Sequence, residues 1–102
     1  MPGRTSSRPR LQSRETAAFA GDIDAFLNFI DLERGLSPRT QEGYSSDLDQ
    51  CAAFLARHGA TDWRSVGGDL LGRWLQSLSG ADYTVASLAR KLTALRGLAR
   101  YL

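Results

Sequence analysis

The sequence predicts an all-α protein: a single domain built as a bundle of four main helices. Apolar residues recur at spacings of three and four along the chain, and no segment shows the period-two alternation typical of strands. Glycines separate the apolar stretches where helices would end. With 102 residues, 42% of them hydrophobic and 24% charged, the chain has the composition of an ordinary single domain.

The first fourteen residues differ in composition from the rest. They are rich in Arg, Ser and Pro and contain little apolar surface to bury. We therefore expect residues 1–14 to form a disordered basic tail and residues 15–102 to form the folded domain. An Arg- and Ser-rich, acid-poor start also resembles a transit peptide, but two prolines and the lack of amphipathic periodicity argue against that interpretation.

The first two helices have clear boundaries. The first is expected over residues 15–34 with Gly35 as its C-terminal cap, and its apolar face comprises Phe19, Ile23, Phe26, Leu27 and Ile30. Ser37 followed by Pro38 is a strong helix-start signal, so the second helix is expected from Ser37 to His58, before Gly59. Its core stripe comprises Tyr44, Leu48, Cys51 and Leu55.

The second half of the domain follows a loop in which Trp63 and Val66 are expected to fill the core. The third helix is expected from about Gly67 to Gly80, with an inward face of Leu71, Trp74, Leu75 and Leu78. The fourth is expected to begin near Thr84. Its inward face is predicted to comprise Leu88, Leu92, Leu95, Ala99 and Leu102.

Positive charge is concentrated at the two ends of the chain. The net charge is only +2, but all 11 acidic residues lie between Glu15 and Asp82. Residues 1–14 and 83–102 contain arginines and a lysine and no acid. Such segregation favours a polyanionic partner.

Two predicted helix faces combine basic and small residues. Arg39 lies in the first turn of the second helix, where the helix dipole favours an anion over a cation. The side opposite the core stripe of that helix presents Arg39, Gly43, Ser46 and Gln50. The side of the fourth helix opposite its leucines presents Arg90, Thr93, Ala94 and Gly97, with Ser87 and Lys91 on one margin and Arg96 on the other.

These faces are either a nucleic-acid surface or ordinary solvated helix surfaces. Small residues between basic ones would let a helix approach a groove while arginines reach phosphates or base edges. Gly43 and Gly97 favour the first interpretation, because a glycine in a helix interior costs about 1 kcal/mol relative to alanine. On a plain surface nothing would compensate for that cost.

Residue types suited to catalysis or metal binding are scarce. Cys51 and His58 are the only cysteine and histidine, which excludes an internal disulfide and disfavours a zinc site or a histidine-dependent triad. Cys51 is expected to be buried and His58 to cap the second helix. No tyrosine has a basic constellation nearby, so we predict no catalytic residue, metal or cofactor. The lone cysteine suits a cytoplasmic location, and no apolar run is long enough to span a membrane.

Three segments together resemble a known family. They are "FLNFIDLERGLSPRTQEGYSSDLDQCAAFL" (residues 26–55), "DWRSV" (62–66) and "SLARKLTALRGLARYL" (87–102). Over about residues 19–102 the chain resembles the N-terminal core-binding domain of tyrosine recombinases, closest to the Xer type. The resemblance implies a SAM-like helical bundle that forms half of a C-shaped clamp around duplex DNA, with the second and fourth helices facing the major groove.

The resemblance also implies which residues face DNA and which partners to expect. The DNA-facing residues would be Arg39, Thr40, Gly43, Ser46, Gln50, Ser87, Arg90, Lys91 and Ala94, and Arg96 on the margin of the fourth helix is predicted to bind DNA with them. Arg39 and the free N–H groups of its helix start would hold one phosphate. The expected partners are double-stranded DNA and other recombinase protomers in a synaptic complex, with no membrane and no small-molecule substrate.

The family's catalytic residues lie in a C-terminal domain, so we expect this chain to be a non-enzymatic DNA-binding module cut from a longer recombinase. The sequence leaves the target site open, and leaves open chromosome-dimer resolution against phage or mobile-element integration. The alternative from another class is a standalone helical protein–protein module whose basic faces bind an acidic partner.

Overall fold

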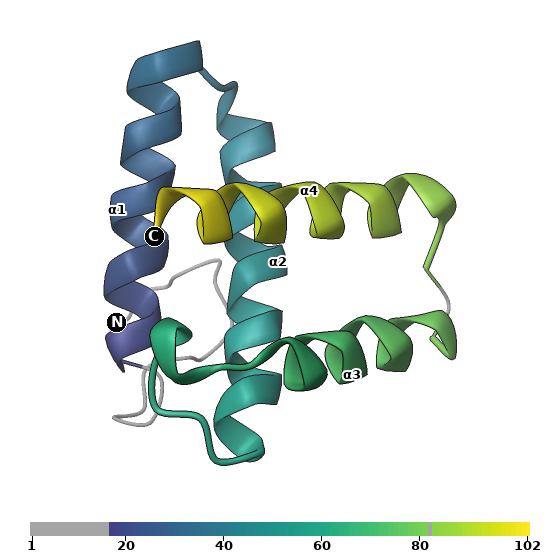
Figure 1. Ribbon diagram of the computed structural model, residues 1–102. Helices are drawn as coiled ribbons and strands as arrows, with labels where there is room; N and C mark the ends of the chain where they lie inside the picture. The colour runs from purple at the N-terminus through teal and green to yellow at the C-terminus, as the bar shows by residue number, and fades with distance from the viewer. Residues whose placement is uncertain (1–16, 82) are drawn as a thin grey trace, which may run out of the picture.

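The computed structural model describes residues 17–81 and 83–102. The expected tail, residues 1–14, and the expected first two residues of the first helix lie outside the described residues. Within them the chain forms four α-helices and no strand, as the sequence predicts. The elements are α1 (Ala17–Arg34), α2 (Pro38–Arg57), the short 3₁₀ turn η2 (Trp63–Ser65), α3 (Gly68–Ser79) and α4 (Val85–Tyr101) (Figure 1).

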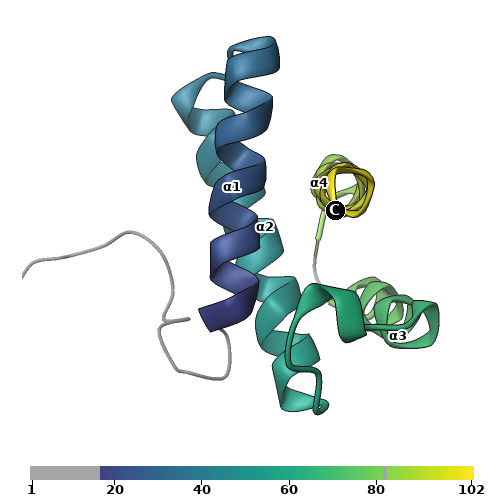
Figure 2. The same ribbon diagram turned by 60° about the vertical axis from the view of Figure 1, so that its left-hand side comes forward.

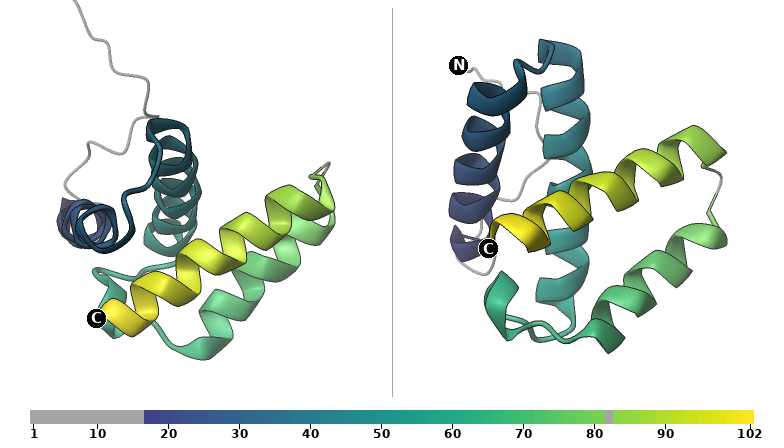
Figure 3. Two further views of the ribbon diagram at one scale, coloured as in Figure 1. Left: turned by 90° about the horizontal axis from the view of Figure 1, so that it is seen from above. Right: turned by 45° about the horizontal axis from the view of Figure 1, so that its top comes forward.

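The four helices are arranged in two layers that cross. α1 and α2 lie side by side and antiparallel, and α3 and α4 run across them in opposite directions (Figure 1). Turned views place α3 and α4 in a second layer on one side of the α1–α2 pair (Figures 2 and 3). α2 is central, because α1, α3 and α4 all pack against it. The C-terminal end of α4 reaches α1.

The helix ends follow the local sequence signals. The Ser37 hydroxyl accepts a hydrogen bond from the Thr40 amide at 3.1 Å, and the Thr84 hydroxyl accepts one from the Ser87 amide at 3.1 Å. Gly35 and Gly59 follow α1 and α2 with φ of 66° and 94°, in the left-handed region that glycine adopts without strain. The predicted C-terminal end of the first helix and both predicted ends of the second are therefore confirmed.

The core forms where the predicted faces of the first three helices meet one side of α4. Phe19, Ile23 and Phe26 of α1 pack with the buried stripe of α2, which comprises Leu48, Cys51, Ala52 and Leu55, and with Trp74 and Leu78 of α3. Trp63 closes one end of this core as predicted. Its ring meets Phe19 edge to face at 5.2 Å, and its Nε1 donates to the Phe19 carbonyl at 3.1 Å.

The prediction for the inward face of the fourth helix was wrong in part. Among its expected core residues Leu95 is buried, but Ala99 and Leu102 are exposed. The buried residues of α4 are Lys91, Ala94, Leu95 and Leu98. Because apolar residues occur on most sides of this helix, periodicity alone did not single out one stripe. The contact with α2 selects the side that contains a lysine.

Candidate nucleic-acid interface

The first turn of α2 contains an arginine that has no partner in the part of the chain that is described. Arg39 follows Ser37 and Pro38, and the first turn of α2 contains no acidic residue. The Arg39 side chain is exposed and forms no salt bridge with any described residue. The unfavourable placement of a cation at the positive end of the helix dipole is therefore not offset within residues 17–81 and 83–102.

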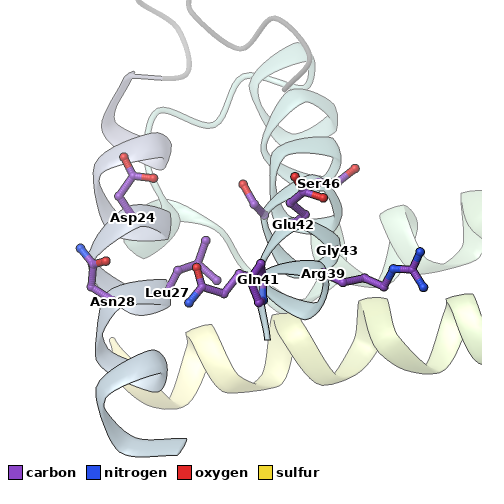
Figure 4. A pocket seen from close by; sticks show the side chains of 10 residues that line it. Asp24, Leu27, Asn28, Arg39, Gln41, Glu42, Gly43 and Ser46 are labelled. Carbon is purple, nitrogen blue, oxygen red and sulfur yellow. The ribbon is translucent and has the colours of Figure 1, made fainter. Parts of the chain in front are cut away.

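A hollow of about 800 Å³ separates α1 from the first half of α2, next to Arg39. Asp24 and Asn28 of α1 and Gln41 and Glu42 of α2 line it, and the Arg39 side chain extends away from α1 (Figure 4). Two carboxylates make this hollow unsuitable for an anion. Arg39 also lines the hollow, but its guanidinium points away from the α1 side of it.

The crossing of α2 and α4 is built around a buried carboxylate. Asp47 is 0% exposed and accepts two hydrogen bonds from Arg90, from Nε to Oδ2 at 2.7 Å and from Nη2 to Oδ1 at 3.0 Å. Lys91 Nζ, on a residue only 2% exposed, lies 2.8 Å from Asp47 Oδ1 and 3.0 Å from Gln50 Oε1. The hydrogen bond to Asp47 raises the pKa of Arg90 above its usual value.

Lys91 is therefore a structural cation, and its predicted place on the margin of the outward face was wrong. Besides Asp47 and Gln50, its ammonium group lies 4.7 Å from the centre of the Tyr83 ring. A lysine can be buried here because an ionised partner and an amide oxygen compensate for the loss of water. Ala94, also predicted to face outward, is 1% exposed and belongs to the core.

The two helix glycines make close contacts inside the domain. A Cβ at Gly43 would lie 3.2 Å from the Cζ, Nε and Nη1 atoms of Arg90. A Cβ at Gly97 would lie 2.8 Å from Cζ of Phe26. Packing between helices therefore compensates for both glycines, and the prediction that they serve a nucleic-acid surface was made on the wrong ground.

The remaining predicted site residues are partly or fully exposed. Thr40 accepts a hydrogen bond from the Ser37 hydroxyl at 2.9 Å, and the Gln50 amide lies 3.4 Å from the Ser46 hydroxyl. Ser87 lies in the first turn of α4, half-buried, and Arg96 is exposed. The structure thus gathers Gly43, Ser46, Gln50, Arg90 and Lys91 at one crossing and leaves Arg96 further along α4.

Arg96 lines a separate groove that the sequence did not reveal. The groove has a volume of about 700 Å³ and lies between α1 and the C-terminal half of α4. Arg34, Arg96 and Arg100 line it together with the aromatic side chains of Phe26, Phe29 and Tyr101. Phe29 and Tyr101 are 45% and 38% exposed, and their ring centres lie 5.1 Å apart. Arg34 and Arg100 are 66 positions apart in the sequence, and no local pattern links them.

Residues of catalytic type have structural roles. Cys51 is fully buried, and burial raises the pKa of its thiol to about 12. His58 is the C-cap of α2, where its Nδ1 lies 2.9 Å from the Phe54 carbonyl. The described residues hold no group of three His, Cys, Asp or Glu placed to bind a metal ion. Among the described helices, none has the length and apolarity to cross a membrane.

Asp47 is the main residue of this crossing that is absent from the predicted site. A signal for it exists, because Gly43, Asp47 and Gln50 follow one another at spacings of four and three on α2. The identity of its partners, 43 and 44 residues away in the sequence, has no local signal.

Comparison with known proteins agrees with this architecture. Residues 23–102 match the family model for the phage integrase N-terminal SAM-like domain. The chain is 37% identical over 79 residues to the tyrosine recombinase XerC of Bifidobacterium longum, covering 78% of this chain and 22% of that protein. It is 41% identical over 81 residues to the XerC of Lacticaseibacillus casei, covering 78% of this chain and 27% of that protein.

The XerC of Azotobacter vinelandii gives a similar result, with 40% identity over 81 residues. The chain spans about a quarter of the length of these curated relatives. No solved structure matches it with significant similarity. The all-α fold, the matched residues and these identities together show that the chain belongs to the family of phage integrase N-terminal SAM-like domains.

Proposed function

We propose that this chain is the DNA-binding module of a site-specific tyrosine recombinase and that it clamps duplex DNA at a recombination half-site through α2 and α4. Other protomers of the recombinase would bind neighbouring half-sites in a synaptic complex. A separate domain would cut and rejoin the strands through a covalent phosphotyrosine. The chain by itself would leave a nicked half-site duplex free of any covalent protein–DNA adduct.

The observation that supports DNA binding most directly is the charge on α4. This helix crosses α2, contains no acidic residue, and exposes Arg90, Arg96 and Arg100. Arg39 adds an exposed guanidinium, without a partner among the described residues, at the start of α2, where the Thr40 and Gln41 amides are already bonded to Ser37. Arginines and helix N-termini are the groups that contact phosphates and base edges in protein–DNA complexes.

The ten predicted DNA-facing residues have two roles in this proposal. Arg39, Thr40, Ser46, Ser87, Arg90 and Arg96 are exposed or half-buried and would contact DNA. Gly43, Gln50, Lys91 and Ala94 would shape the crossing beneath these contacts. Because a recombinase acts where DNA is, the cytoplasmic location expected from the sequence remains part of the same proposal.

The test is the salt dependence of binding to a duplex. Each neutralised phosphate contributes about 0.9 to the slope of log affinity against log salt concentration, so about three to five contacts should weaken binding at least tenfold between roughly 50 and 200 mM salt. Arg39→Ala should lower this slope by about one and weaken binding similarly on all sequences. Arg73→Ala, which removes an exposed arginine of α3, is the matched control and should leave the slope unchanged. A slope near zero for the wild-type chain would refute the proposal.

One observation favours a second candidate function, the binding of an acidic protein partner. The groove lined by Arg34, Arg96 and Arg100 also contains exposed aromatic surface, which suits an acidic peptide with an apolar anchor. Competition decides between the two functions. If an acidic aromatic peptide binds more tightly than duplex DNA in 150 mM salt, this candidate replaces the first.

A further inference from the structure

The Asp47 carboxylate fixes the orientation of the Arg90 guanidinium. Its two oxygens accept from Nε and Nη2 at 2.7 and 3.0 Å, so the pair is bidentate. The guanidinium also lies against α2 where Gly43 has no side chain, since Cζ, Nε and Nη1 would all lie 3.2 Å from a Cβ there. Asp47 and Gly43 together restrain a side chain that is otherwise among the most mobile.

Three N–H groups of Arg90 remain available for a ligand. A guanidinium has five N–H groups, and Asp47 takes one from Nε and one from Nη2. The other three bond to no described residue, and the side chain is 43% exposed. These three are the two N–H groups of Nη1 and the second one of Nη2. Nη1 and Nη2 form the outer end of the guanidinium, which we call the fork and which can donate two parallel hydrogen bonds.

Lys91 keeps this site positive. Asp47 and Arg90 alone would form a neutral pair, but Lys91 Nζ is 2.8 Å from the same carboxylate and is buried with it. The three groups therefore carry a net charge of +1. The exposed member, Arg90, remains attractive to an electron-rich ligand although a carboxylate holds it.

We propose that Asp47 is a positioning residue that presents Arg90 to the O6 and N7 acceptors of a guanine in the major groove. The inference rests on the proposed function, because it needs duplex DNA at the α2–α4 crossing. Two parallel donors on a restrained arginine match the paired acceptors of guanine, which is the commonest specific arginine contact with DNA. Restraint before binding reduces the rotamer freedom that the contact would otherwise cost.

The experiment measures sequence discrimination separately from affinity. The probe is a duplex that the wild-type chain selects from a randomised 20-base-pair pool, compared with versions in which each G·C pair is replaced by A·T. The wild-type chain should lose about 5- to 150-fold in affinity at one replaced pair, which is the discrimination of a bidentate contact. Arg90→Lys keeps the charge and loses the fork, so the discrimination at that pair should fall below about twofold.

Two variants test the positioning by Asp47 and Gly43. Asp47→Asn replaces one of the two acceptor oxygens by an amide group, and Gly43→Ala shifts the guanidinium by a few tenths of an ångström while keeping every charge. Both should reduce the discrimination at the same pair at least several-fold. Affinity for a duplex of unrelated sequence should change little for Gly43→Ala and should not fall for Asp47→Asn, which removes a negative charge. Gly72→Ala, at a helix glycine with no neighbour within 4 Å, is the control. Helix content by circular dichroism checks folding, and if Asp47→Asn does not fold, Gly43→Ala is the deciding variant.

The outcomes separate this inference from the function on which it rests. If a folded Gly43→Ala or Asp47→Asn variant loses affinity equally on all duplexes, the residue is only structural and the inference is wrong. If the wild-type chain binds duplexes but selects no particular sequence, the inference is also wrong, while the proposed function remains intact. Failure of the wild-type chain to bind any duplex refutes both.

Discussion

Replacing Gly97 by alanine tests whether this glycine serves packing inside the domain or approach to a partner. The structure places the new Cβ 2.8 Å from Cζ and 3.3 Å from Cε1 of Phe26. A contact below 3.0 Å requires movement, and Phe26 is only 3% exposed, with Tyr101 next to its ring at 5.8 Å. The ring cannot rotate freely away, so α4 and α1 must separate slightly.

Two terms of opposite sign determine the size of the effect. Overpacking lowers the free energy of unfolding by about 1–3 kcal/mol, while replacing a glycine by alanine in a helix interior raises it by about 1 kcal/mol. We therefore expect Gly97→Ala to lower the free energy of unfolding by about 1 kcal/mol, within a range of about 0–2. Gly72→Ala in α3 has open space around its Cβ and should raise the same quantity by up to about 1 kcal/mol.

The assay is urea denaturation followed by the fluorescence of the two buried tryptophans, Trp63 and Trp74. The two variants are expected to shift the midpoint in opposite directions at an unchanged slope. If Gly97→Ala stabilises the chain as much as Gly72→Ala does, Gly97 makes no essential contact with Phe26. Its presence would then again need an explanation outside the domain.

Three further predictions concern groups that the structure places in the interior or at a helix start. Lys91→Met should lower the free energy of unfolding by about 1–3 kcal/mol, because the Asp47 carboxylate keeps Arg90 but loses its buried partner Lys91. The double mutant Lys91→Met/Asp47→Leu should recover part of this loss, and a double mutant no more stable than Lys91→Met would contradict the prediction. The pKa of the Cys51 thiol is raised to about 12, so in the folded protein this thiol should stay unreactive toward a thiol reagent at pH 8, and rapid labelling of the native chain would show that it is accessible. The free energy of unfolding should fall as the pH rises above about 9, because the thiol ionises there in the unfolded chain and not in the folded one. Ser37→Ala removes the cap of α2 and should cost about 1 kcal/mol in the same denaturation assay, whereas Ser79→Ala, at an exposed helix end with no amide to cap, should cost much less.

Much of the fold could be predicted because its signals are local. Ser37, Thr84, Gly35 and Gly59 act on the backbone within a few residues, and the structure confirms each of these helix boundaries. The short turn η2 was expected only as a loop, although Asp62 caps it through a 2.9 Å hydrogen bond from the Ser65 amide. Three residues are too few for a periodic signal.

The sequence by itself determined the helices, their ends, the core faces of the first three, and an excess of positive charge on the fourth. Only the tertiary structure decided which side of α4 is buried, because that depends on Asp47, whose partners Arg90 and Lys91 lie 43 and 44 residues further along the chain. The roles of Gly43 and Gly97 were likewise decided only by the tertiary structure. Nothing within a few residues of either glycine specifies that Arg90 and Phe26 will lie against it, because helix crossings bring these pairs together and local backbone preferences do not.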